Sequence, residues 1–346
     1  MQYFPQLKPR PQDEAVPLPQ YVQIEPVGQC NLRCRMCPVQ FRDDGPPGPS
    51  AFMPFDRFCS LIEQFDALTE LHLQGLGEPL LHPRFFDMVR HASERGIRVS
   101  TNTNMTVMTP EQAAQCVSSG LHTMHVSLDG ASAASYEAIR VRARFDKVLR
   151  NLRRLMAARA AAGSELPHVG LVAVAMRQNI EELPQLLRLA HAEGVRSVSV
   201  QHLCHDFGEE SLPARYRPMR RFIDEQTLLG EERARVEAVF DAARAEAERL
   251  GVALRLPRLE PRLHASDVPG PQRCDWPWRG AYVSYDGKAM PCCMVATPDR
   301  IHFGDMARES VVKVWNNAAY RDFRAQLSSA TPPAVCRSCA VYKGTF

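Results

Sequence analysis

The stretch Cys30-Asn31-Leu32-Arg33-Cys34-Arg35-Met36-Cys37 places three thiols within eight residues, with three and then two positions between them. Thiolates are soft ligands that suit zinc, copper(I) and iron–sulfur clusters. Three thiolates from one short loop can hold three irons of a [4Fe–4S] cube and leave its fourth iron open to a ligand. Zinc knuckles do not need this spacing, and buried structural cysteines do not come in such triplets. The sequence therefore predicts an iron–sulfur cluster at Cys30, Cys34 and Cys37.

This triplet resembles the C-x-x-x-C-x-x-C signature of the radical SAM superfamily, and all three cysteines match. Met36 stands where the family usually has an aromatic residue. The resemblance implies that the open iron chelates the amino and carboxylate groups of S-adenosylmethionine (SAM). Reductive cleavage of SAM would then give methionine and a 5′-deoxyadenosyl radical, which abstracts hydrogen from a substrate. It also implies an external electron donor such as flavodoxin or ferredoxin.

The composition limits the other classes of protein. The chain has 346 residues, 45% of them hydrophobic, and a formal net charge of +3, which is too small to argue for a nucleic-acid partner. It contains no apolar run of 18 residues, so we expect no membrane span. Residues 1–20 hold five prolines and no signal-peptide core. Eleven cysteines without an export signal indicate a reducing compartment, so we expect a cytoplasmic protein.

Strand-like and helix-like segments alternate from residue 21 to residue 201, which predicts βα units and a parallel sheet. The helix-like segments are 54–68, 84–95, 110–118, 133–139, 145–162 and 180–192. The six expected strands are Tyr21–Glu25, Leu71–Gln74, Ile97–Thr101, Thr123–Leu128, Val169–Ala175 and Val198–Gln201. The fold class is therefore α/β, and the strand count is similar to the partial (β/α)6 TIM-like barrel of the radical SAM core. Chemistry in barrels sits at the carboxyl ends of strands, and the cysteine triplet follows the first strand.

Changes in composition divide the chain into four segments. Residues 1–20 read as an extended arm, for which a poorly ordered leader is an open alternative. Residues 21–205 form the predicted core. Residues 206–272 form a helical bridge, with a charged helix near 231–250 and a possible strand at 252–256, followed by a proline-rich linker. Residues 273–346 form a predicted small C-terminal domain, which holds the second set of thiols described below.

Gly75-Leu76-Gly77-Glu78-Pro79 follows the second strand and is similar to the family's G-G-E-P motif. Glycine allows the backbone to approach a ligand closely. The resemblance implies that Gly77 and Glu78 bind SAM, with the carboxylate on its amino group. An ordinary βα turn is the structural alternative.

Four further candidates for SAM binding come from resemblance to the family. Thr103 and Asn104 end the third strand, and Ser127 ends the fourth, within a segment that looks like S-[IL]-D-G. Arg140 carries a planar guanidinium that can pair with the SAM carboxylate. Each has a structural alternative, because such polar residues also cap helices and such arginines also lie on helix surfaces. We expect Asp129 to be a turn former before Gly130.

Four histidines divide into two groups. His202 and His205 lie beyond the sixth strand and are candidate catalytic proton carriers, with a structural role as the alternative. His72 and His125 lie inside strands, where we expect packed or hydrogen-bonded side chains.

A second set of thiols begins after residue 273. Four separated thiolates can hold either zinc or a [4Fe–4S] cluster. C-x12-G-x4-C followed by a distant C-x-x-C is similar to the shortened SPASM domain called twitch, which implies an auxiliary [4Fe–4S] cluster. The pattern predicts a hairpin with an Asp-Gly turn at 282–290 and an amphipathic helix over Val311–Leu327. The implied ligands are Cys274, Cys292, Cys336 and Cys339, with Cys293 as the rival of Cys292. Since no cysteine follows Cys339, we expect one auxiliary cluster, with no open iron, that transfers electrons.

Three hypotheses for the function remain. In the first, the protein abstracts hydrogen from a small polar molecule, such as a sugar, aminocyclitol or nucleoside, and completes a two-electron oxidation through the auxiliary cluster. In the second, it modifies a peptide or matures another protein, although the short N-terminal arm holds no peptide-recognition segment. In the third, it is a non-catalytic iron–sulfur or zinc protein, which the SAM-type motifs disfavour.

Overall fold

The computed structural model describes residues 15–42, 49–203, 212–260, 274–295 and 297–345. Its centre is a nine-stranded sheet in the order β7-β6-β5-β4-β3-β2-β1-β8-β9. Neighbouring strands are parallel except for the last pair, β8 and β9. The strands are β1 (Tyr21–Ile24), β2 (Glu70–Leu73), β3 (Arg98–Thr103), β4 (Leu121–Ser127), β5 (His168–Ala175), β6 (Ser197–His202), β7 (Ala253–Arg255), β8 (Gly280–Val283) and β9 (Ala289–Met290). The predicted partial (β/α)6 barrel is confirmed.

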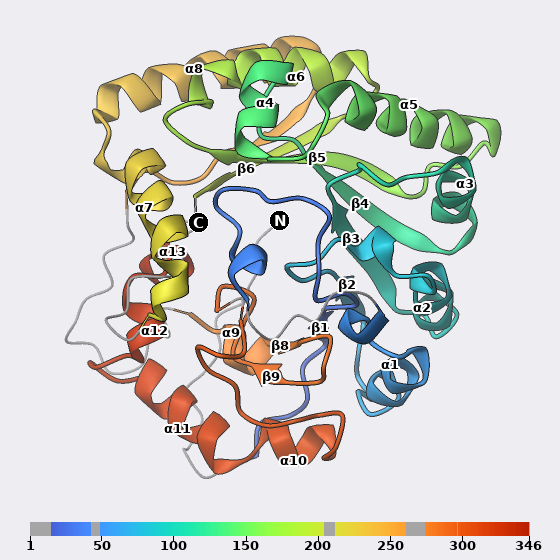
Figure 1. Ribbon diagram of the computed structural model, residues 1–346, viewed down its shortest axis with the longest axis vertical. Helices are drawn as coiled ribbons and strands as arrows, with labels where there is room; N and C mark the ends of the chain where they lie inside the picture. The colour runs from blue at the N-terminus through green and yellow to red at the C-terminus, as the bar shows by residue number, and fades with distance from the viewer. Residues whose placement is uncertain (1–14, 43–48, 204–211, 261–273, 296, 346) are drawn as a thin grey trace.

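The sheet curves around the segment that follows β1, with the helices on its outer side (Figure 1). The core helices are α1 (Phe55–Ile62), α2 (Phe85–Ser93), α3 (Pro110–Ser118), α4 (Ala133–Ile139), α5 (Phe145–Ala161), α6 (Leu183–Ala192), α7 (Arg217–Gln226) and α8 (Arg233–Leu250). Local chemistry explains their ends. Thr109 and Gln112 form a capping box at the start of α3, and α8 ends at Gly251 in the left-handed region at φ 63°.

The two faces of the sheet carry different side chains, because successive residues of a strand point to opposite sides. Val22, Ile24 and Leu71 are fully buried in the core beneath the helices. Polar side chains occupy the concave face, where Gln23 donates to the carbonyl of Gln74 and His72 contacts the hydroxyl of Ser100. The helices therefore cover an apolar outer face, while the concave face offers hydrogen-bonding groups.

The C-terminal region continues the same sheet. Its strand β8 pairs in parallel with β1, from Tyr21 opposite Gly280 to Ile24 opposite Val283. At the other end β7, which lies in the predicted bridge, pairs with β6. One sheet therefore contains strands from both sides of the predicted domain boundaries near residues 205 and 273. The boundaries themselves stay predictions. The C-terminal helices are α9 (Trp276–Arg279), α10 (Val311–Trp315), α11 (Ala318–Leu327), α12 (Ala334–Arg337) and α13 (Ala340–Lys343).

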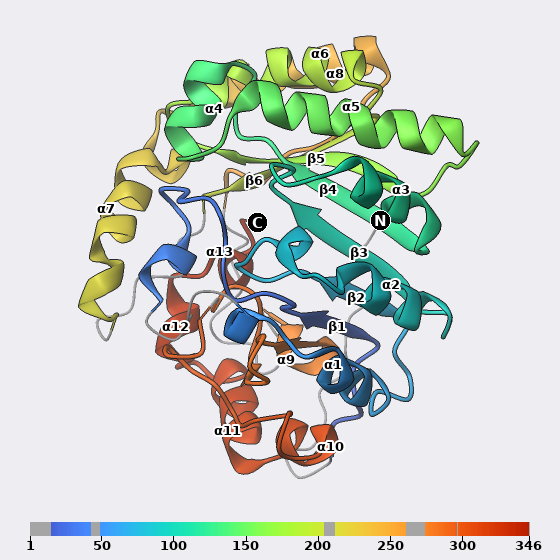
Figure 2. The ribbon, with the colours of Figure 1, turned by 45° about the vertical axis from the view of Figure 1, so that its right-hand side comes forward.

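The single helix predicted over Val311–Leu327 is wrong. The chain forms α10 and α11, which are separated at Asn316 and Asn317 (Figure 2). The Asn317 side chain accepts a hydrogen bond from the Tyr320 amide, so it caps the start of α11. Trp315, on the buried side of α10, is fully buried.

The described end of the N-terminal arm lies against α10. The indole Nε1 of Trp315 donates to the carbonyl of Pro17 over 3.0 Å, and the Val16 amide donates to Asn316 Oδ1 over 2.8 Å. Residues 15–18 are therefore attached to the C-terminal region, while residues 1–14 lie outside the described part. Among the described helices, none combines the length and apolar character that a membrane crossing requires.

Candidate active site

The loop with Cys30, Cys34 and Cys37 begins just beyond β1, at the carboxyl edge of the sheet. Its backbone lies along the end of α4, because the Arg33 amide donates to the Val141 carbonyl over 3.0 Å and the Arg35 amide donates to the Ile139 carbonyl over 3.2 Å. Burial raises the pKa of Cys30 to about 12, with the Glu78 carboxylate as the next cause. These thiols are protonated without metal, and they become thiolates when iron binds.

A network of amides and hydroxyls surrounds Cys30. Asn104 Nδ2 lies 3.6 Å from Cys30 Sγ and donates to Asn31 Oδ1 over 3.0 Å. Asn31 Nδ2 in turn donates to the Thr106 hydroxyl, which donates to Asn104 Oδ1. The predicted residue Asn104 therefore touches the cysteine loop itself. Asn31 and Thr106 were not predicted, although Asn31 stands inside the cysteine motif.

The Glu78 side chain is 2% exposed and accepts three hydrogen bonds. Its donors are the Thr103 hydroxyl (2.7 Å), the Asn104 amide (2.7 Å) and the Leu80 amide (3.1 Å). Burial raises the pKa of the Glu78 carboxyl, while these three hydrogen bonds act against the rise. The arrangement brings three of the predicted SAM-binding residues into one contact group.

Gly77 is the point at which this group meets the cysteine loop. The Glu78 amide donates to the Gln29 carbonyl over 3.0 Å. A Cβ atom on Gly77 would lie 2.0 Å from the Val27 carbonyl oxygen, which belongs to the backbone and cannot swing away. The close approach of the two loops therefore requires glycine at this position.

Replacing Gly77 with alanine should separate the two loops. We expect the overpacked variant to lose about 1–3 kcal/mol of unfolding free energy and to bind SAM about tenfold more weakly or worse. Chemical denaturation and calorimetric titration measure the two effects. Gly230→Ala is the matched control, because its Cβ would meet nothing closer than 3.6 Å. Equal SAM affinity in both variants would contradict this account of Gly77.

Arg140 is buried and forms an ion pair with Asp129, with Nε 2.7 Å from Oδ2. Burial raises the pKa of the Cys34 thiol, and the positive charge of Arg140 opposes the rise. Asp129 Oδ1 also accepts from the Val174 amide over 2.8 Å. We expected Asp129 to be a turn former before Gly130, and the structure gives it a contact that was not predicted, because its carboxylate pairs with a buried guanidinium. Ser127 is the last residue of β4, at the same edge.

The histidines occupy different settings. His202 ends β6 at 3% exposure, its Nε2 lies 2.7 Å from the Arg258 carbonyl oxygen, and burial lowers its pKa. Its catalytic role stays a prediction, and His205 lies outside the described residues. Burial lowers the pKa of His72 to about 4, while Ser100 and Gln74 hold its ring. His125 is likewise kept neutral by burial, which lowers its pKa.

The second thiol set comes together in the C-terminal region. Burial is the main cause that raises the pKa of Cys336, and the next causes are the neighbouring thiols of Cys292, Cys274 and Cys339. Burial also raises the pKa of Cys274 to about 12. These are the four predicted ligands. Among the described residues no three His, Cys, Asp or Glu side chains are arranged to hold one metal ion. A cluster binds its thiolates through separate irons, so the convergent thiols fit a cluster.

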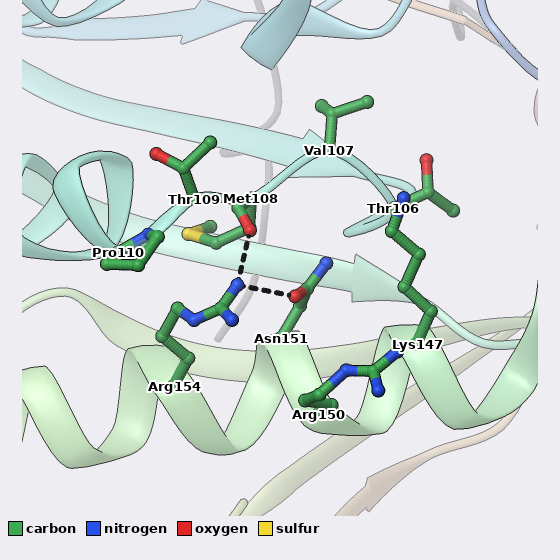
Figure 3. A pocket seen from close by; sticks show the side chains of 9 residues that line it. All are labelled: Thr106, Val107, Met108, Thr109, Pro110, Lys147, Arg150, Asn151 and Arg154. Atoms are coloured by element: carbon green, nitrogen blue, oxygen red, sulfur yellow. Dashed lines mark hydrogen bonds between the residues drawn. The ribbon is translucent and has the colours of Figure 1, made fainter.

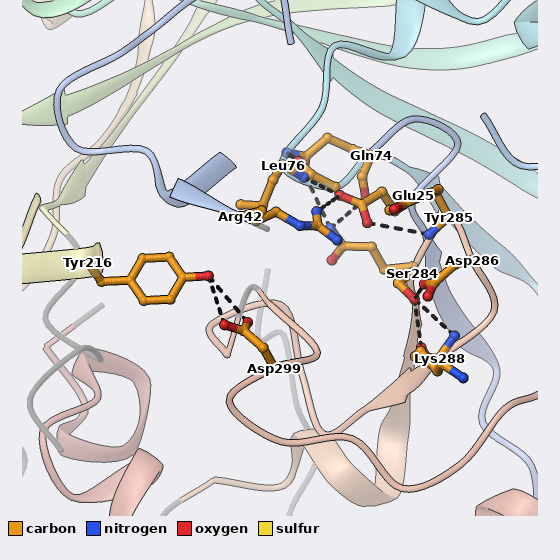
Figure 4. Close-up of polar contacts among 12 residues, drawn as sticks. Glu25, Arg42, Gln74, Leu76, Tyr216, Ser284, Tyr285, Asp286, Lys288 and Asp299 are labelled. Carbon is orange, nitrogen blue, oxygen red and sulfur yellow. Dashed lines mark hydrogen bonds and ion pairs between the residues drawn. The ribbon is translucent and has the colours of Figure 1, made fainter. Parts of the chain in front are cut away.

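A buried ion pair that was not predicted joins the two regions (Figure 4). Glu25 and Arg42 are both fully buried, with Arg42 Nη1 3.0 Å from Glu25 Oε1. Glu25 also accepts from the Leu76 amide over 2.9 Å and from the Tyr285 amide over 3.4 Å. The alternation of Gln23 and Glu25 after Tyr21 could have placed Glu25 on the concave face, but no pattern marks Arg42 as its partner.

Tyr282 lies between this ion pair and the second thiol set. It is 1% exposed on β8, opposite Gln23 of β1. Burial raises its pKa well above the ordinary value. Glu25 and the thiols of Cys293 and Cys292 act in the same direction, and Arg42 opposes them. The concave face of the sheet is thus continuous with the surroundings of the second thiol set.

A partial α/β barrel with three thiols beyond its first strand, and four convergent thiols at the far end of the same sheet, defines a protein built to hold two iron–sulfur sites. The Radical SAM superfamily model matches residues 24–190, and the model of the SPASM iron–sulfur cluster-binding domain matches residues 274–340. The chain belongs to the radical SAM superfamily and carries a C-terminal SPASM domain. Its cofactors are SAM and a [4Fe–4S] cluster in the radical SAM domain, with auxiliary iron–sulfur binding in the SPASM domain.

Two curated relatives match nearly the whole chain. The tungsten-containing aldehyde ferredoxin oxidoreductase cofactor-modifying protein of Pyrococcus furiosus is 25% identical and covers 93% of this chain and 87% of its own. The PqqA peptide cyclase of Xanthomonas euvesicatoria is 27% identical, with 93% and 80% covered. Among solved structures, Streptococcus suis SuiB bound to precursor peptide SuiA has a TM-score of 0.69 at 15% identity, with 94% and 71% covered. This last likeness concerns the fold.

Proposed function

We propose that the protein is a radical SAM enzyme that oxidises a peptide substrate by hydrogen abstraction. The observation that supports the radical step is the contact of Asn104 with both Cys30 Sγ and the Glu78 carboxylate, because it brings the thiol motif and the G-x-G-E-P motif into one group. The peptide class rests on similarity over almost the full length to the PqqA peptide cyclase. Of the sequence-based hypotheses, the relatives thus favour the second over the first.

Different residues of the site would bind the iron–sulfur cluster and SAM. Cys30, Cys34 and Cys37 would hold the [4Fe–4S] cluster, which supplies the electron that cleaves SAM. The Glu78 carboxylate would accept hydrogen bonds from the SAM ammonium group. The Thr103 hydroxyl and the Asn104 amide donate to this carboxylate and fix its orientation. Arg140 would contribute positive charge toward the SAM carboxylate from its place beside Cys34. Gly77 would keep the two loops close, and Ser127 would face the nucleoside end.

The oxidation requires the loss of two electrons and two protons from the substrate. Bound SAM would supply the group that removes one hydrogen atom from the substrate, which accounts for one electron and one proton. The SPASM iron–sulfur site would accept the second electron, and a base would accept the second proton, with His202 and His205 as the proposed acceptors. The ligands proposed for one auxiliary [4Fe–4S] cluster are Cys274, Cys292, Cys336 and Cys339.

A second candidate substrate class is a small polar molecule, as the first hypothesis proposed. The observation in its favour is the hydrogen-bonding character of the concave face, where Gln23, His72, Gln74 and Ser100 are linked. Such groups can bind hydroxyl and amino groups of a sugar or aminocyclitol, but they can equally bind peptide amides.

The two classes can be tested together. Anaerobically reconstituted protein with SAM and dithionite is incubated either with short peptides encoded beside its gene or with a panel of sugars, aminocyclitols and nucleosides. We expect one peptide to stimulate 5′-deoxyadenosine formation and to lose two hydrogens in its mass spectrum. Stimulation by a small molecule alone would overturn the peptide proposal, and no 5′-deoxyadenosine under any condition would overturn the radical mechanism.

A further inference from the structure

The outer surface of the barrel has a basic pocket of about 280 Å³ between α5 and the loop before α3 (Figure 3). Lys147, Arg150 and Arg154 line it from α5, and Thr106–Pro110 lines it from the loop. We call these residues the α5 basic surface. Arg154 is fixed, because its Nη1 donates over 2.8 Å to both the Met108 carbonyl and Asn151 Oδ1.

The pocket lining carries three cationic side chains and no acidic one. Residues 140–154 contain seven Arg or Lys and one acidic residue, Asp146, although Arg140, Arg144 and Arg153 form ion pairs with carboxylates of other segments. Lys147 is exposed and pairs with no carboxylate among the described residues. Arg150 is exposed, and its Nη2 lies 3.8 Å from Asp146 Oδ2. Because water screens an exposed ion pair of this length, the attraction between the two side chains is weak. Such a surface attracts a negatively charged partner and accelerates its encounter.

The same surface is adjacent to the cysteine loop. Thr106, which lines the pocket, accepts a hydrogen bond from Asn31 and donates one to Asn104. Asn104 Nδ2 lies 3.6 Å from Cys30 Sγ. A path from the surface to the first thiol therefore passes through one asparagine side chain. Electron transfer through protein slows steeply with distance, so a donor seated here would be favourably placed.

We propose that the α5 basic surface docks an acidic electron-carrier protein of the flavodoxin or ferredoxin class. The carrier is oxidised by one electron, the iron–sulfur centre at Cys30 is reduced by that electron, and no bond is made or broken. This inference rests on the proposed function, since it needs a chemistry that consumes electrons. Transient redox complexes have small interfaces, in which charge complementarity sets the rate of encounter and the specificity.

The test uses the double variant Lys147→Glu, Arg150→Glu, with Arg244→Glu, Arg249→Glu on α8 as the matched control. All four side chains are exposed, and none belongs to the groups proposed to bind SAM or the iron–sulfur clusters. SAM cleavage is measured with reduced flavodoxin at increasing concentration and, separately, with dithionite. We expect the α5 variant to need about tenfold more flavodoxin for half-maximal rate at low salt, with its dithionite-driven rate and iron content unchanged. The α8 variant should match the wild type in both assays.

A direct measurement of binding keeps the docking proposal separate from the activity. Carbodiimide crosslinking of Lys147 to flavodoxin carboxylates, read by mass spectrometry, and calorimetric titration do not require SAM cleavage. If the wild type cleaves no SAM but binds flavodoxin through this surface, the proposed function fails and the docking survives. Equal flavodoxin affinity in the wild type and the α5 variant overturns the docking. Loss of oligonucleotide binding alone in the α5 variant overturns it too, and would assign the surface to a nucleic acid.

Discussion

Replacing Cys34 with serine is expected to abolish the formation of 5′-deoxyadenosine, with at least a thousandfold loss. The reconstituted wild type should contain about eight irons in two four-iron clusters, and the variant about four. The reason is geometric, because Cys34 lies between Cys30 and Cys37 in one short loop and is held against Arg140. Iron analysis and chromatography of 5′-deoxyadenosine with dithionite and SAM measure both effects.

Cys59→Ser is the matched control for this experiment. Cys59 is on α1, outside both thiol sets, and its side chain is only partly buried. We expect this variant to retain about eight irons and wild-type SAM cleavage. If the Cys34 variant still produced 5′-deoxyadenosine at the rate of the control, the assignment of the loop as the site of the radical cluster would be wrong.

Replacing Cys336 with serine is expected to separate SAM cleavage from product formation. The pKa of this thiol is raised by burial and by Cys292, Cys274 and Cys339, so it lies among all the other proposed ligands. The variant should keep about four irons, which belong to the first cluster. It should still form 5′-deoxyadenosine, whereas the oxidised product should fall at least a hundredfold because the second electron has no acceptor.

The adjacent residues Cys292 and Cys293 are the two rival ligands of the auxiliary cluster, and their variants can be compared directly. Cys292, but not Cys293, fits the C-x12-G-x4-C spacing counted through Gly287, and Cys292 is also among the causes that raise the pKa of Cys336. On this spacing we expect Cys292→Ser to behave like Cys336→Ser, and Cys293→Ser to keep about eight irons and full product formation. The reverse result would exchange the two ligands. Zinc in place of four irons in the wild type would refute the auxiliary cluster.

Much of the core could be predicted from its sequence pattern. Strands such as Val169–Ala175 have apolar runs between turn residues, and the observed β5 differs by one residue. The triplet of thiols and Glu78 could be predicted as well, because each motif occupies a few consecutive positions. The helix over Val311–Leu327 was overextended because apolar periodicity continues through Asn316 and Asn317, where the capping preference of asparagine prevails.

Other features depend on contacts between residues distant in sequence. Glu25 and Arg42 attract one another only because folding buries both, and neither has a spacing that identifies the other. Asp129 resembles a turn residue when it is read beside Gly130, but its partner Arg140 is on the following helix end. The pairing of β1 with β8 joins residues about 260 positions apart, and a strand carries no mark of its distant neighbour.

The parallel pairing of β1 with β8 has a consequence for how such a chain could arise or be shortened. In most two-domain proteins a linker can be cut and each half keeps a closed core. Here a chain that stops before Gly280 would leave the amides and carbonyls of Tyr21–Ile24 as an open edge, which invites aggregation. The SPASM domain therefore covers the β1 edge of the barrel, so its removal would expose backbone of the core as well as take away the second set of thiols.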